Sequence, residues 1–160
     1  MSEIAREKAL VLVDQAQRLQ FRGAFSEAIQ LYRRSIDMYP TAEAYTYLGW
    51  TYSMMSRYED AIAVCEQAIA VDPAFGNPYN DIGAYLIELD RPEEAIPWLE
   101  KATTAERYDE RQFPLINLGR IYEQLGKYRT ALDYYNQALA IDPFDAGARL
   151  AKYGLLGQMN

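Results

Sequence analysis

Three kinds of side chain recur at spacings that would let them bind a peptide: aromatic rings, carboxamides and a guanidinium group. Tyr47, Trp50 and Phe113 offer apolar faces for a partner's side chains. Asn80 and Asn117 carry carboxamides, which can hydrogen-bond to the backbone amides of an extended chain. These residue types indicate recognition of a protein segment.

Charged residues near the same positions allow two interpretations. Arg120 could hold a carboxylate through its planar fork, or it could simply pair with Glu123 or a neighbouring acid. Asp81 could belong to the site or be solvated, and Asn77 could contribute to it or only cap a helix.

Residues suited to catalysis are scarce in the sequence. It has no histidine, the commonest general base and metal ligand, and no glycine-rich loop of the phosphate-binding type. Cys65 occupies an apolar helical pattern and is interpreted as an inert core thiol. We therefore expect no enzymatic activity, no cofactor and no metal site.

Composition indicates which classes of partner are disfavoured and which compartment is favoured. Sixteen basic residues against 23 acidic ones give a net charge of −7, which opposes binding to nucleic acid or to an anionic membrane. A single cysteine forms no internal disulfide, which favours a reducing, cytoplasmic and bacterial-type context. The start of the chain lacks the apolar core of a signal peptide, and no run approaches the ~20 apolar residues of a membrane span.

The elements that position these residues are all helices. Apolar periodicity and breakers predict them over residues 3–21, 25–37, 42–54, 58–71, 77–89, 91–105, 112–125, 128–141 and 145–158. Thr41 and Asn77 are expected to cap the helices that follow them. Gly154 and Gly157 are expected to fray the end of the last helix.

A repeat relates these helices to one another. Gly49, Gly83 and Gly119, each after a leucine or isoleucine, lie 34 and 36 residues apart, an interval typical of stacked helix pairs. Glycine inside a helix costs roughly 1 kcal/mol relative to alanine, so a closely approaching helix must offset that cost.

The repeating unit resembles the tetratricopeptide repeat. Its clearest copy reads Tyr45, Leu48, Gly49, Tyr52, Ala61, Cys65, Ala68 and Pro73. The resemblance implies an all-α fold, a right-handed superhelical solenoid of antiparallel helix pairs. It divides a single domain, residues 1–160, into four repeats of about 9–41, 42–75, 76–111 and 112–145 and a capping helix of about 146–158.

The same resemblance implies that the opening helix of each repeat lines a concave groove that holds a peptide. The positions opposite the packing face are then the candidate binding residues: Thr46, Tyr47, Trp50, Met54, Asn80, Asp81, Ile87, Phe113, Asn117 and Arg120. The carboxylate clamp of heat-shock co-chaperones is not expected, because Val13 and Gln17 stand where its basic and amide residues would be.

The expected function is therefore that of a protein-interaction scaffold with a protein or peptide partner. Two alternatives remain: self-assembly through the terminal repeats, including the apolar Leu155-Leu156 end, and a secretion-type or co-chaperone role holding an unfolded client. Two extra residues near Asp109, where the helix-ending proline is missing, either shape the groove or tilt the last repeat.

Overall fold

The computed structural model describes residues 2–160, and that range contains nine helices and no strand. The helices are α1 (Ser2–Phe21), α2 (Phe25–Met38), α3 (Ala42–Met54), α4 (Tyr58–Val71), α5 (Asn77–Glu88), α6 (Pro92–Thr104), α7 (Gln112–Gln124), α8 (Tyr128–Ile141) and α9 (Ala146–Met159). Each predicted helix is present, with ends that differ by one residue or none.

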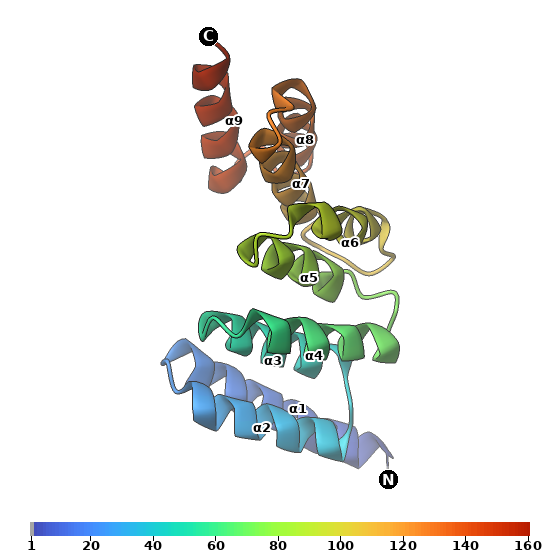
Figure 1. Cartoon of the computed structure of the whole chain (residues 1–160). Helices are drawn as coiled ribbons and strands as arrows, with labels where there is room; N and C mark the ends of the chain where they lie inside the picture. The colour runs from blue at the N-terminus through green and yellow to red at the C-terminus, as the bar shows by residue number, and fades with distance from the viewer. Residues whose placement is uncertain (1) are drawn as a thin grey trace.

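Successive helices form pairs that stack along one direction, with the two termini at opposite ends of the stack (Figure 1). The odd-numbered helices α1, α3, α5, α7 and α9 each contact the next odd-numbered one. Within the described range, α2, α4, α6 and α8 do not contact one another. The odd-numbered helices therefore form the tighter inner row, and the all-α superhelical solenoid is confirmed.

Close approach within each pair accounts for the helical glycines. A Cβ atom on Gly49 would lie 2.9 Å from the sulfur of Cys65 on α4. A Cβ on Gly83 would collide with Leu99, and one on Gly119 with Tyr135, which occupy the equivalent places in their pairs. The expected close approach of a neighbouring helix at these glycines is confirmed.

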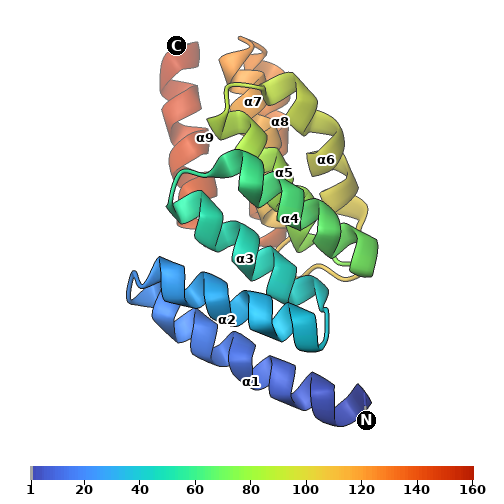
Figure 2. The same ribbon diagram turned by 60° about the horizontal axis from the view of Figure 1, so that its bottom comes forward.

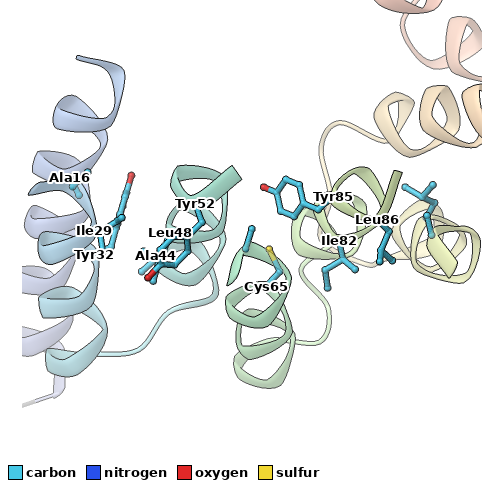
Figure 3. Packing of buried hydrophobic residues seen from close by; sticks show 14 of the residues in the cluster. Ala16, Ile29, Tyr32, Ala44, Leu48, Tyr52, Cys65, Ile82, Tyr85 and Leu86 are labelled. Carbon is cyan, nitrogen blue, oxygen red and sulfur yellow. The ribbon is translucent and has the colours of Figure 1, made fainter. Parts of the chain in front are cut away.

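Tyrosines fill the space between successive pairs. Tyr32, Tyr52 and Tyr85 are buried beside Leu48 and Ile82 (Figure 3). The hydroxyl of Tyr32 donates to Gln20 Oε1 at 2.6 Å, which satisfies its polar group inside the core.

Cys65 is completely buried in the same cluster (Figure 3). Burial raises the pKa of its thiol well above the usual range, which keeps it protonated and supports its interpretation as a core residue.

Helix starts follow the expected capping only in part. Thr41 Oγ1 accepts from the backbone N–H of Ala44 at 3.1 Å, as predicted. The prediction that Asn77 caps α5 is wrong: the cap position is Gly76, and Asn77 is the first helical residue. The side chain of Asn77 is thereby released to line a cavity on the inner face.

The expected fraying of α9 is also wrong. The helix continues through Gly154 and Gly157 to Met159. Leu155 lies between the two glycines and is completely buried against α7 and α8, so packing of this turn offsets their low helix propensity.

Helix α9 packs on the rest of the chain through the face that carries Ala148 and Leu155. Ala148 and Leu155 are buried, whereas Leu150 is 76% exposed and Tyr153 is 63% exposed. Consequently, Leu155 of the expected apolar end is part of the core, whereas the exposed large apolar side chains of α9 are Leu150, Tyr153 and Met159.

Candidate functional site

The inner face holds a cavity of about 510 Å³, which we call the central cavity. It lies between α3, α5, the start of α7 and the connection between α6 and α7. Its lining consists of Glu43, Thr46, Tyr47, Trp50, Phe75, Asn77, Asn80, Asp81, Tyr108, Asp109, Glu110 and Phe113.

Aromatic rings make up one wall of the central cavity. Tyr47 and Trp50 come from α3, with ring centroids 6.5 Å apart, and Phe113 comes from α7. Trp50 and Phe113 remain 39% and 38% exposed, so their rings are available to a ligand. Phe21 of α1 contacts the ring of Trp50 edge-on at 5.9 Å and extends the aromatic surface toward the N-terminal end.

Three of the other predicted site residues behave differently from one another. Thr46 lines the cavity but is buried, and its hydroxyl donates to the carbonyl of Ala42 at 2.7 Å. Met54 is exposed and accepts a long hydrogen bond from Gln20, away from the cavity lining. Ile87 packs against the core and does not line the cavity either.

The two predicted amides bind each other. Asn117 Nδ2 of α7 donates to Asn80 Oδ1 of α5 at 3.0 Å, and Asn80 is buried. This bond ties the inner row together between the third and fourth pairs. It also occupies the Asn80 oxygen that sequence reasoning assigned to a peptide.

A second depression of about 490 Å³, which we call the C-terminal hollow, adjoins the central cavity. It is lined by Asn80, Phe113, Ile116, Asn117, Arg120, Asp145, Ala146 and Gly147. Arg120 is exposed here and forms no ion pair with Glu123, which instead accepts from the Tyr135 hydroxyl at 2.9 Å. Of the two alternatives for Arg120, the pair with Glu123 is therefore not formed, and the cation faces solvent.

Asp81 carries the most perturbed carboxyl group of the central cavity. The pKa of Asp81 is raised from 3.8 to about 7, mainly by burial and to a smaller extent by the nearby charge of Glu110. A hydrogen bond from Asn80 acts in the opposite direction but is the smaller effect. Asp81 therefore titrates near neutral pH instead of being a fully solvated carboxylate.

The connection between α6 and α7 supplies a wall that sequence reasoning missed. Tyr108, Asp109 and Glu110 line the central cavity from this segment. Tyr108 is buried and packs so closely on Gly76 that a Cβ there would lie 2.5 Å from the Tyr108 Cβ. The two extra residues and the missing proline were the signal for this segment, and residues 108–110 do line the cavity.

Backbone hydrogen bonds fix this wall in place. The N–H of Arg107 donates to the carbonyl of Ala74, and the N–H of Gly76 donates to the carbonyl of Arg107, both at 3.0 Å. The resulting parallel bridge joins the α6–α7 connection to the α4–α5 connection, and both views show the two segments side by side (Figures 1 and 2).

Arg107 stands where the family's proline would be and binds across the rim of the cavity. Its guanidinium contacts Asp72 at 2.6 Å and Glu43 at 3.1 Å, and it lies 4.2 Å from the ring centroid of Phe75. A hydrogen bond from Arg107 lowers the pKa of Asp72. The rim thus already combines a cation, an aromatic face and two carboxylates.

Residues 2–160 contain neither a helix suited to spanning a membrane nor a cluster of metal-binding side chains. No helix in this range combines the length and apolar character needed to cross a bilayer. No three potential metal-binding side chains gather there as a ligand set.

Comparison with known proteins matches most of the stack to one family. A family model described as tetratricopeptide repeat matches residues 76–143, and a second model with the same description matches residues 42–75.

Similar proteins come from several sources. Anaphase-promoting complex subunit 3 of Schizosaccharomyces pombe (strain 972 / ATCC 24843) is 30% identical over 132 residues, or 82% of this chain and 20% of the relative. Anaphase-promoting complex subunit 6 of Arabidopsis thaliana is 29% identical over 119 residues, or 72% of this chain and 22% of the relative. The chain spans about a fifth of the length of these curated relatives.

A solved structure of pilF from Pseudomonas aeruginosa superposes with a TM-score of 0.87 at 24% identity. The superposition covers 99% of this chain and 70% of the other. At this identity the likeness supports the fold.

Proposed function

The chain belongs to the tetratricopeptide repeat family, and on that premise we propose that it is a protein-binding module whose central cavity holds a segment of a partner protein. Proteins with this fold commonly mediate protein–protein interactions. The family is generally non-catalytic, which agrees with a scaffold.

The central cavity is the observation that carries the proposal. Its volume of about 510 Å³ falls within the range of ligand sites, and it combines apolar rings with a few polar groups, as binding sites do. Trp50 and Phe113 both line it and stay partly exposed although aromatic rings gain from burial. A partner's side chain bound in the cavity would bury more of both rings.

A peptide selection tests this function directly. A library of random linear peptides displayed on phage would be selected on the immobilised wild-type chain, and the enriched peptides synthesised and titrated by fluorescence anisotropy. The test variant is Trp50→Ala with Phe113→Ala. Loss of two aromatic contacts should weaken binding by at least about tenfold.

The matched control truncates two aromatic side chains outside the cavity, Phe144→Ala with Tyr153→Ala, which are 84% and 63% exposed. Affinity for this control should equal that of the wild-type chain. Enriched peptides that bind both variants equally, or a selection without enrichment, would reject the central cavity as the binding site.

A chaperone-like role is a form of the same proposal, in which the held segment belongs to an unfolded client. The cytoplasm is the compartment we propose, because Cys65 is a single buried thiol that needs no oxidising environment. Neither nucleic acid nor a membrane is proposed as a partner, since the net charge of −7 opposes both.

Self-association is the second candidate function, and one observation favours it. Leu150 and Tyr153 of α9 lie exposed, and a second copy could cover them. Light scattering on the full chain and on a Leu150→Ser, Tyr153→Ser variant tests it. A mass that rises with concentration in the wild-type chain alone would support assembly, and a monomer in both would reject it.

A further inference from the structure

The central cavity is lined by charge of one sign. Asp81, Asp109 and Glu110 contribute carboxylates, and no lysine or arginine is among the lining residues of the described chain. Within residues 2–160, none of these three carboxylates has an ion-pair partner within 4.0 Å. The remaining acid of the lining, Glu43, is paired with Arg107 at the rim.

Aromatic rings line the same cavity as these carboxylates. Tyr47 and Trp50 belong to α3, Phe75 and Tyr108 to the two connections, and Phe113 to α7. The face of an aromatic ring carries partial negative charge and attracts a cation lying over it. Rings and carboxylates in one cavity therefore favour the same class of ligand.

The rim provides an example of that recognition within the chain itself. Arg107 lies over the ring of Phe75 and binds the carboxylates of Asp72 and Glu43, and so satisfies one guanidinium group with one aromatic face and two acids. The interior of the cavity repeats this combination of groups but lacks the cation.

Burial of Asp81 gives the cavity a reason to bind a cation. Removing a carboxylate from water is costly unless an opposite charge compensates it. Burial holds the pKa of Asp81 near 7, so about half of the Asp81 carboxyl groups are neutral at that pH. A positive ligand beside Asp81 would stabilise its charged form.

We infer that the central cavity receives an arginine or lysine side chain of the bound segment, held between the aromatic faces and beside the carboxylates of Asp81 and Glu110. This inference rests on the proposed function and specifies the chemistry of its ligand. It also separates the cavity from the C-terminal hollow, where Arg120 would attract an acidic group.

The peptides enriched on the wild-type chain supply the probes. Each basic residue of such a peptide is replaced in turn by its neutral isostere, citrulline for arginine and norleucine for lysine. One replacement should weaken binding by about tenfold, because it removes the charge and leaves the side chain's size and apolar stem nearly unchanged.

The protein variants locate that basic residue. Asp81→Asn and, separately, Glu110→Gln should each weaken the unmodified peptide about fivefold to tenfold, and the neutral isostere should lose little further affinity on either variant. Asp133→Asn on α8 is the control, since Asp133 is an exposed carboxylate outside the cavity. Two separate variants keep the test decisive if one of them folds poorly by circular dichroism.

The outcomes of these binding experiments distinguish a failure of this inference from a failure of the proposed function. Peptides that require Trp50 and Phe113 but bind equally well with neutral isosteres, or that are acidic, would overturn this inference and leave the proposed function standing. Equal losses of peptide affinity for Asp81→Asn and Asp133→Asn would also overturn it. The carboxylates would then attract the peptide at long range and not at a specific site. Peptides independent of Trp50 and Phe113 would reject the proposed function itself.

Discussion

The central cavity and the C-terminal hollow adjoin each other on the inner face and share Asn80 and Phe113, yet their chemistry differs. The connection between α6 and α7 covers the first and adds carboxylates and a tyrosine, whereas α9 borders the second and leaves Arg120 in solvent. The inner helices are similar in both places. The segments that join or follow the helix pairs therefore set the character of each site.

The largest expected effect comes from replacing the partly buried carboxyl group of Asp81 in the central cavity. Asp81→Asn should stabilise the chain at high pH, because the folded state then no longer holds a partly buried carboxylate. Because folding raises the pKa of Asp81, the stability that its protonated side chain contributes to the wild-type chain is fully present below about pH 4. It is lost as pH rises to about 7. The difference between variant and wild type should reach up to about 4 kcal/mol, measured by urea unfolding at about pH 4 and about pH 8.

The control in the other region is Asp145→Asn at the C-terminal hollow, where the carboxylate caps α9 by accepting from the N–H of Ala148 at 2.9 Å. That substitution should leave stability nearly unchanged, because asparagine caps helices about as well as aspartate. A stability difference for Asp81→Asn that stays constant across the pH range would contradict the assignment of a buried titrating group.

A glycine exchange tests whether the wall of the central cavity is rigid. Gly76→Ala places a Cβ 2.5 Å from the Tyr108 Cβ, an atom next to the backbone, so the α6–α7 connection must move. We expect a loss of about 1–3 kcal/mol in the free energy of unfolding, together with weaker peptide binding. Gly154→Ala in α9 meets no atom within 4 Å and should stabilise the chain by up to about 1 kcal/mol. If both substitutions raised the free energy of unfolding, the wall of the cavity would not be rigid.

The hydrogen bond between the two sites has a smaller expected effect. Asn117→Ala removes the donor to the buried Asn80 oxygen and should cost about 1 kcal/mol in chemical unfolding. Asn136→Ala on α8 is the matched control, because Asn136 is exposed and makes no side-chain hydrogen bond among those of the described residues. Equal stability of the two variants would mean that the amide pair contributes nothing to holding the inner row together.

The smallest effect is expected for the two arginines that border the sites. Arg107→Ala breaks two exposed ion pairs and the contact with Phe75, and should cost up to about 1 kcal/mol, less at high salt. Arg120→Ala should change stability by less, because Arg120 has no ion pair in the described part of the chain. Unfolding at low and high ionic strength distinguishes them, and a salt-independent cost for Arg107→Ala would point to packing on Phe75 alone.

Sequence reasoning found the aromatic part of the site and missed its acidic wall. Tyr47, Trp50 and Phe113 share a cavity because helical periodicity determines which side chains face the inner row. Tyr108 and Glu110 belong to an irregular segment, for which no periodicity gives a direction. Their placement depends on the bridge between Phe75 and Arg107, two residues far apart in the chain.

The sequence by itself determined the helices and their stacking order, because local hydrophobic periodicity and the spacing of Gly49, Gly83 and Gly119 act within and between neighbouring repeats. Only the tertiary structure decided which polar groups meet. It joined Asn80 to Asn117, left Arg120 in solvent and raised the pKa of Asp81 through burial. Solvation and pairing of a side chain depend on what several distant segments place around it, and no local pattern records that arrangement.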